Sequence, residues 1–254
     1  IMNGFMKFAF WGALAAGATG CDQYQSYTDT IEVNGQKLFY ACEGHGKPVV
    51  LIHGNSGSHN DLETTQRQLA QAGYLVYALD ERGQGANEPL EEYHYADMAR
   101  DVRAFIKAKK IKKPAVFGWS DGGIVALMLE SMFPGTCSLL VTSGANITAD
   151  LAIVDEAYED MFGSYEDADS MPPLLRMMYL EPNMKPKDLK RIKIPVLVCA
   201  GENDLILPEH TQYITECLPK GEKKIIPDAD HGSHIWHNRL MGDIMLEYFK
   251  KQGY

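Results

Sequence analysis

The sequence predicts an α/β protein with a mostly parallel sheet that is covered by helices on both faces. Three observations lead to this fold class. Short apolar runs of the buried-strand type alternate with helical patterns along most of the chain. An antiparallel hairpin precedes this alternation, and 254 residues are enough for one domain with a sizeable core. Such alternation is typical of parallel β/α units.

The hairpin is predicted by Asn34-Gly35, a two-residue turn signal between the strand-like segments 31–33 and 37–41. With the hairpin, the buried-type runs make a predicted sheet of eight strands, and these runs are 49–52, 74–79, 115–117, 138–142, 194–200 and 223–226. Helical patterns separate the strands and cover 60–72, 95–109, 121–133 and 235–251.

One stretch interrupts the alternation. Residues 147–193 are acidic at first, rich in methionine later, and contain no convincing strand pattern. Short helices are predicted within this stretch at 155–161, 174–179 and 187–191. An insertion of this size between two central strands predicts a small helical cap over an active site. We therefore expect a core made of 28–146 and 195–254, with the cap insertion at 147–194.

The composition excludes some classes of function. The formal net charge of −10 argues against a nucleic-acid partner, because phosphate contacts need a basic face. A lysine-rich run at 107–113 closes a predicted helix, where cations suit the helix dipole, and we interpret it as a solvated helix end. None of the five cysteines forms a C-x-x-C pair, so neither a zinc site nor a disulfide framework is predicted.

The N-terminal residues 1–27 need a separate interpretation. A lysine precedes an apolar, alanine-rich stretch over 8–18, which is too short to span a bilayer but typical of a secretory signal. The following Thr-Gly-Cys sequence resembles a bacterial lipobox, although a larger aliphatic residue usually stands at the place of Ala18. We favour a lipoprotein signal and tether, with Cys21 as a membrane anchor in a bacterial cell envelope. The alternative is an ordinary amphipathic or buried helix in a cytoplasmic protein.

A serine stands where a predicted buried strand turns directly into a helix, in Gly118-Trp119-Ser120-Asp121-Gly122. A G-x-S-x-G pattern alone is common by chance, and its meaning comes from the strand–turn–helix context. Small residues let the helix approach the strand and expose the serine hydroxyl. The helix N-terminus then offers unpaired N–H groups to a developing oxyanion. We predict that Ser120 is a catalytic nucleophile.

A second loop is expected to complete an oxyanion hole. His53, Gly54 and Asn55 follow the strand 49–52, where a backbone N–H donor is expected beside such a nucleophile. We predict that the two donors are the backbone N–H groups of Asn55 and Asp121. His53 is interpreted as a structural hydrogen-bonding residue and not as a base.

The base and the acid that a serine nucleophile requires follow in the order nucleophile, acid, histidine. Asp204 stands on the loop after the strand 194–200, and His231 stands on the loop after the strand 223–226. The carboxyl ends of parallel strands meet at one edge of a sheet, so these side chains should converge with the serine. We predict that His231 is the base and Asp204 the orienting acid, with Glu202 as a rival acid.

Two further histidines compete with His231 as the base. They form the pattern His231-x-x-His234-x-x-His237, which invites comparison with a metal site. On a helix, however, positions i, i+3 and i+6 do not share one face, and the intervening Gly-Ser favours a loop. We therefore expect no metal at this segment.

With these motifs in place, the chain from about residue 28 onward resembles the α/β-hydrolase superfamily. The segment 80–85, Asp-x-Arg-Gly-x-Gly, looks like the structural turn that follows the fourth strand of that superfamily. The family pattern usually continues to a serine where this chain has Asn87. The resemblance implies the α/β-hydrolase fold and a serine hydrolase, with Arg82 as a structural brace in preference to an oxyanion ligand.

The resemblance is sharper to the valacyclovir hydrolase (biphenyl hydrolase-like) group, in segments 118–124 and 143–146. In that group the aspartate after the nucleophile is implicated in holding the α-amino group of the substrate. Applied to this chain, the resemblance implies that Asp121 and Trp119 bind substrate and that α-amino acid esters are preferred. The alternative for Asp121 is a helix cap.

These expectations describe a serine hydrolase that cleaves small carboxylic esters through an acyl-enzyme and needs no cofactor. Lactonase, aminopeptidase, perhydrolase and C–C bond hydrolase activities share the same fold and triad and differ in the pocket and cap. A non-catalytic ligand-binding protein on the same fold is the alternative from a different class.

Overall fold

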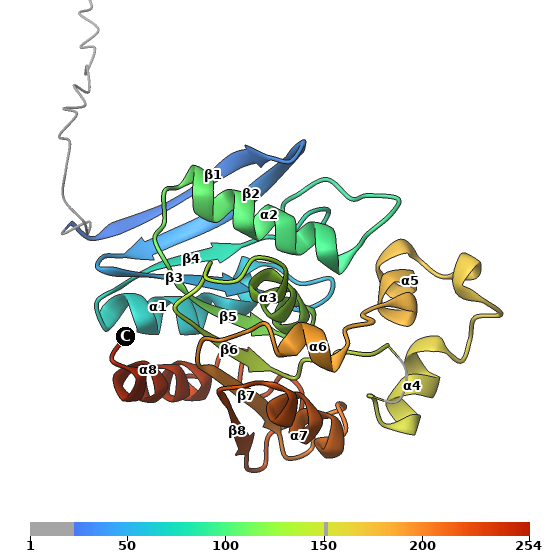
Figure 1. Ribbon diagram of the computed structural model, residues 1–254. Coiled ribbons are helices and arrows are strands. Elements are labelled where there is room, and N and C mark those ends of the chain that lie inside the picture. Colours follow the sequence, from blue (N-terminus) through green and yellow to red (C-terminus); the bar gives the residue numbers. More distant parts are fainter. Residues whose placement is uncertain (1–22, 150–151) are drawn as a thin grey trace, which may run out of the picture.

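The computed structural model describes residues 23–149 and 152–254, and it has the predicted fold class (Figure 1). Eight strands form one sheet in the order β1-β2-β4-β3-β5-β6-β7-β8. The β1–β2 and β2–β4 pairs are antiparallel, and all other neighbours are parallel. The strands are β1 Gln25–Val33, β2 Gln36–Gly44, β3 Lys47–Ile52, β4 Tyr74–Leu79, β5 Ala115–Trp119, β6 Leu139–Ser143, β7 Val196–Gly201 and β8 Gly221–Ile226.

The strand predictions are confirmed by the burial and turn geometry. All five residues of β5 are buried, as a central strand covered on both faces requires. At the tip of the β1–β2 hairpin, Asn34 and Gly35 have φ of 49° and 75°. Two successive residues with positive φ match the two-residue turn that the Asn-Gly signal predicted.

Helices cover both faces of the sheet (Figure 1). One face carries α1 and α8, whose apolar side chains pack with Leu51 and Phe117 of the strands. The opposite face carries α2, α3 and α7, which pack with Ile52 and Val116. The helices are α1 Glu63–Gln71 after the 3-10 turn His59–Leu62, α2 Tyr95–Ala108, α3 Asp121–Met132, α7 Pro208–Cys217 and α8 Leu240–Gln252.

The predicted start of the last helix at Ile235 is wrong, because α8 begins at Leu240. His237 has a φ of 50°, which an α-helix cannot accommodate. Residues 231–236 instead form a compact turn, in which the Gly232 carbonyl accepts hydrogen bonds from the N–H groups of Ile235 and Trp236.

The helices predicted in the inserted segment are present between β6 and β7. They are α4 Asp155–Phe162, α5 Pro173–Leu180 and α6 Pro186–Leu189, with a 3-10 turn at Ala168–Ser170. In Figure 1, α4 and α5 lie beyond the end of the sheet, whereas α6 lies beside α3. The segment has its own small apolar cluster, which includes Phe162 and Met171 and also takes in Ile206 from the core.

The loop after β4 is braced by buried charged groups. The Asp80 carboxylate accepts hydrogen bonds from His59 N–H at 2.6 Å, from His59 Nδ1 at 2.8 Å and from Ala86 N–H at 2.8 Å. Arg82 donates to both carboxylate oxygens of Asp101 at 2.7 and 2.8 Å, which is the structural bracing role expected for it. Burial alone would raise the pKa of Asp80. The hydrogen bonds lower this pKa by more than burial raises it, so the net shift is downward.

We expect Asp80→Asn to lower the free energy of unfolding by about 2 kcal/mol at pH 7, because one buried N–H donor loses its acceptor. The pKa of Asp80 is lower in the folded than in the unfolded protein, so its stabilisation is present above about pH 4 and lost below. Urea unfolding measured at several pH values should therefore show that the free energies of unfolding of the wild type and of Asp80→Asn approach each other below about pH 4. Asp160→Asn on the exposed face of α4 is the control, and equal stabilities at pH 7 would contradict the assignment.

Candidate active site

A cavity of about 340 Å³ opens at the carboxyl ends of the parallel strands. Its base is formed by residues that follow β3, β5 and β6 and by the loop after β8. Its polar end holds Asn55, Tyr95, Asp121 and Asn146. Its apolar walls come mainly from the inserted segment and from the loop after β7, through Ile153, Met161, Leu175, Met178, Leu205 and Ile206.

Ser120 lies on the sharp turn between β5 and α3, with φ of 53° and ψ of −119°. Positive φ is strained for a residue with a side chain, and close packing on both sides holds it. A side chain at Gly122 would collide with the carbonyl oxygens of Ile52 and His53, which shows how closely α3 approaches β3. The Ser120 N–H donates to the Ser143 carbonyl at 2.8 Å, which fixes the turn to the neighbouring strand.

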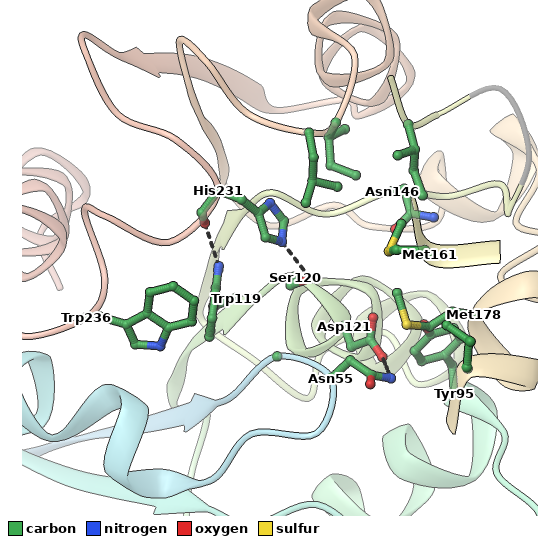
Figure 2. Close-up of a pocket in the computed structure, with 15 residues that line it drawn as sticks. Asn55, Tyr95, Trp119, Ser120, Asp121, Asn146, Met161, Met178, His231 and Trp236 are labelled. Atoms are coloured by element: carbon green, nitrogen blue, oxygen red, sulfur yellow. Dashed lines mark hydrogen bonds between the residues drawn. The ribbon is translucent and has the colours of Figure 1, made fainter. Parts of the chain in front are cut away.

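The structure brings Ser120, His231 and Asp204 into one hydrogen-bonded chain. His231 Nε2 is 2.9 Å from Ser120 Oγ (Figure 2). On the other side of the ring, His231 Nδ1 is 2.6 Å from Asp204 Oδ1. The three side chains come from the ends of β5, β7 and β8, as the order of the motifs predicted. An imidazole held in this way can accept the serine proton at Nε2 while its Nδ1–H stays bonded to the carboxylate.

Asp204 is held as an anion inside the protein. Its carboxylate accepts the Ile206 N–H at 3.0 Å and the Gly201 N–H at 3.2 Å in addition to the His231 bond. Burial raises the pKa of this carboxyl, but His231 and the two backbone donors lower it more, so the net shift is downward. The acid therefore stays ionised over the range in which an imidazole titrates.

The rival acid and the rival bases lie elsewhere. The Glu202 carboxylate accepts the Asp228 N–H at 3.0 Å, whereas His231 Nδ1 bonds to Asp204. His234 is buried and contacts Ser143, and His237 is exposed. Among residues 23–149 and 152–254, no three His, Cys, Asp or Glu side chains lie together in a way that could hold a metal ion.

His53 has the structural role expected for it. Its ring is fully buried, and Nε2 accepts the Glu81 N–H at 3.0 Å. Its other nitrogen, Nδ1, is 2.7 Å from the Gly54 carbonyl. The ring therefore ties the loop after β3 to the loop after β4.

The two predicted oxyanion donors flank the nucleophile. Asn55 follows β3 and Asp121 is the first residue of α3, and both line the cavity with Ser120. In the part of the chain that the structure describes, neither backbone N–H donates to a loop, turn or side-chain acceptor. Their side chains bond to each other, with Asn55 Nδ2 2.9 Å from Asp121 Oδ2 (Figure 2).

The Asp121 carboxyl is almost completely buried beside the nucleophile, with 2% of its surface exposed. Burial raises its pKa to about 6, although Asn55, Tyr95 and His231 act in the opposite direction. The group therefore gains its charge between pH 5 and 7. A carboxylate in so dry a place attracts a cation strongly.

The predicted substrate-binding residue Trp119 also has a structural contact. Its indole Nε1 donates to the His231 carbonyl at 2.8 Å, and its ring meets Trp236 edge-on with centroids 4.9 Å apart. Sequence reasoning missed Trp236, which is 49% exposed at the cavity, and Tyr95, which lies beside Asp121. An aromatic residue five positions after His231 was the available signal for the first of these.

The fold and the strand–helix turn define the class of protein: the chain has the α/β-hydrolase fold. A family model described as alpha/beta hydrolase fold matches residues 47–172. Human serine hydrolase BPHL is 27% identical over 236 aligned positions, and the match covers 81% of this chain and 80% of that protein. The resemblance to the biphenyl hydrolase-like group is thereby confirmed.

Two further proteins show how widely this fold is shared. The pimeloyl-[acyl-carrier protein] methyl ester esterase of Aliivibrio fischeri (strain MJ11) is 25% identical, covering 79% of this chain and 93% of that protein. The structure of a thermophilic esterase from Thermogutta terrifontis superposes with a TM-score of 0.72 at 20% identity, covering 91% of this chain and 99% of that one. At such identity the second likeness shows the fold alone.

We expect Asp204→Asn to lower kcat for an ester substrate about 10²- to 10⁴-fold with little change in KM, because the amide no longer holds the His231 tautomer. Glu202→Gln is the matched control and should leave kcat unchanged, since the Glu202 carboxylate bonds to the Asp228 N–H on the next loop, whereas His231 bonds to Asp204. Steady-state kinetics on a p-nitrophenyl ester measure both variants. A larger loss in the Glu202 variant would reverse the assignment of the acid.

Proposed function

We propose that this protein is a serine esterase that cleaves small carboxylic esters through an acyl-enzyme on Ser120. The observation that carries the proposal is the hydrogen-bonded chain from Ser120 through His231 to Asp204 at the base of a cavity. Relatives that are serine hydrolases or esterases support the same reaction class.

The reaction has two steps that use the same base. His231 Nε2 accepts the proton from Ser120 as Oγ attacks the ester carbonyl, and the backbone N–H groups of Asn55 and Asp121 receive the oxyanion. The single bond between the former carbonyl carbon and the alcohol oxygen then breaks, and the leaving alcohol takes the proton from His231. Water, deprotonated by His231, attacks the acyl carbon of the acyl-enzyme. The bond from this carbon to Ser120 Oγ then breaks, Oγ takes the proton back from His231, and the acid is released. Asp204 stabilises the imidazolium in both steps, and no cofactor is required.

The cavity supports a small, partly apolar substrate. Its volume of about 340 Å³ is at the lower end of the range for small-molecule sites. The inserted segment 147–194 acts as a cap in this proposal, since it supplies the side chains of Met161, Leu175 and Met178 to the cavity wall. Methionine side chains adapt to irregular ligand shapes, which suits a pocket that accepts several acyl or alcohol groups.

A preference for α-amino acid esters is the finer part of the proposal. Among the residues that the structure describes, Asp121 is the one carboxylic acid that lines the cavity, and it is adjacent to the nucleophile. An ammonium group placed there would neutralise the buried carboxylate and exchange one costly desolvated charge for an ion pair. Trp119 lines the cavity on the other side of Ser120 and supplies an apolar surface to the same ligand.

The lipid tether remains a separate proposal. Cys21 lies outside the described residues, and within 23–149 and 152–254 no helix is long and apolar enough to cross a membrane. The apolar stretch before Cys21 supports a lipoprotein signal and tether within 1–27 and a place in the bacterial cell envelope. The mass of the native protein tests it, because cleavage before a lipidated Cys21 would remove residues 1–20.

We expect Ser120→Ala to lower kcat/KM for a p-nitrophenyl ester by at least about 10³-fold, because the variant retains only the binding and oxyanion groups. A fluorophosphonate probe should label the wild type and not the variant. Full esterase activity in a folded Ser120→Ala protein would reject the proposed mechanism. Unlabelled, inactive wild type would instead favour a ligand-binding protein on this fold.

We expect Asp121→Asn to lower kcat/KM about 10-fold or more for α-amino acid esters and to leave esters without the amino group nearly unchanged. The measured quantity is the ratio of kcat/KM for an α-amino acid ester to kcat/KM for the matching ester without the amino group. The titration of His231 affects both values equally and therefore cancels in this ratio. In the wild type this ratio should rise as the pH increases through about 6, where Asp121 ionises. The ratio should be flat in the variant, and a flat wild-type ratio would remove Asp121 from substrate recognition.

A further inference from the structure

A second serine–histidine contact lies at the same edge of the sheet as the nucleophile and base. Ser143, the last residue of β6, places its Oγ 2.7 Å from Nε2 of His234. Both side chains are fully buried. Neither belongs to the cavity lining, so this pair does not meet a substrate.

Ser143 also holds the nucleophile through its backbone. Its carbonyl accepts the Ser120 N–H at 2.8 Å. The next residue, Gly144, lies against the base, because a Cβ added there would be 2.6 Å from Cε1 and 2.8 Å from Nδ1 of the His231 ring. The end of β6 therefore touches both partners of the proposed proton transfer.

His234 and His231 belong to one rigid turn. The Asp230 carboxylate accepts the N–H groups of Gly232 at 2.9 Å and Ser233 at 2.8 Å, which closes the turn between the two histidines. Further bonds to the Gly232 carbonyl continue the turn to residue 236. A contact made by His234 is therefore transmitted to His231 through the two hydrogen-bonded residues between them, Gly232 and Ser233.

These contacts form a closed circuit. It runs from the Ser120 N–H to Ser143, from Ser143 Oγ to His234, along the turn to His231, and from His231 back to Ser120 Oγ. We propose that His234 is a positioning residue, which sets the distance between Ser120 and His231 by anchoring the base-bearing turn to Ser143. The proposal rests on the esterase mechanism proposed above.

The His234 ring suits this role because it stays neutral. Burial lowers its pKa, and His231 acts in the same direction, against the raising effects of Asp204 and of the Asp230 carbonyl and carboxylate. A neutral ring does not add a second positive charge beside the imidazolium that forms on His231 during the reaction. It acts through a hydrogen bond and not through charge.

A second tie limits how much the turn can move without His234. Trp119 Nε1 donates to the His231 carbonyl at 2.8 Å, on the nucleophile side of the turn. If the His234 bond is lost, the Trp119 bond still holds the turn, so we expect the His231 ring to shift only a short distance from Ser120. Misplacement on the order of 1 Å costs up to about 100-fold in rate, so we expect a loss of about 10- to 100-fold.

The test compares His234→Leu, Ser143→Ala, their combination and His234→Gln, with exposed His237→Leu as the matched control. Gln can donate its amide N–H to Ser143 Oγ from near the position of Nε2, and Leu cannot. We expect the first two variants to lower kcat for a p-nitrophenyl ester about 10- to 100-fold with KM nearly unchanged. The rate of fluorophosphonate labelling should fall in parallel, and His234→Gln should recover most of the loss.

The double variant distinguishes positioning from packing. If the two residues act through one bond, the combined loss should equal that of the more affected single variant, whereas independent packing defects would multiply. Wild-type kcat in folded His234→Leu or in Ser143→Ala, a multiplied loss in the double variant, or no recovery with Gln would each overturn the proposal. If His234→Leu does not fold, Ser143→Ala alone decides. Ser120→Ala in parallel tests the esterase mechanism separately.

Discussion

Helix α3 packs so closely against β3 and β5 that no side chain fits between them, and the geometry of the site depends on this contact. A Cβ on Gly118 would meet the backbone of Gly122, and one on Gly122 would meet the carbonyl oxygens of β3 and the following loop. The chain can leave β5 only through a turn that gives Ser120 a φ of 53°, a strain of about 1–3 kcal/mol that the buried surroundings hold. The hydroxyl is thereby raised above the sheet beside a helix N-terminus.

Two carboxyls near the same imidazole have opposite environments. Asp204 receives two backbone N–H groups and the His231 ring, so its pKa is lowered despite burial. Asp121 is more deeply buried and has fewer donors, and its pKa is raised to about 6. Such a separation allows one acid to orient the base permanently and leaves the other to respond to a ligand. The division follows from the depth of burial and from the number of hydrogen bonds that each carboxylate accepts.

The core and the inserted segment contribute different properties. The strand ends and the turns around Ser143 and Gly144 fix the distances between reacting groups, through buried hydrogen bonds and direct contact. The cavity walls come mainly from α4, α5 and the loop after β7, whose side chains form a separate small cluster. The positions of the Ser120, His231 and Asp204 side chains therefore depend on the core, whereas the shape of the cavity depends mainly on the inserted segment and the loop after β7.

The sequence by itself determined the features that local patterns encode. The Asn34-Gly35 hairpin, the serine between a buried strand and a helix, and the positions of Asp204 and His231 after successive strands follow from periodicity, turn residues and chain order. Only the tertiary structure decided which groups touch. The start of α8, the approach of Tyr95 to Asp121 and the His234 contact with Ser143 depend on segments far apart in the chain. Such contacts arise from packing between elements, and no local pattern in the sequence records them.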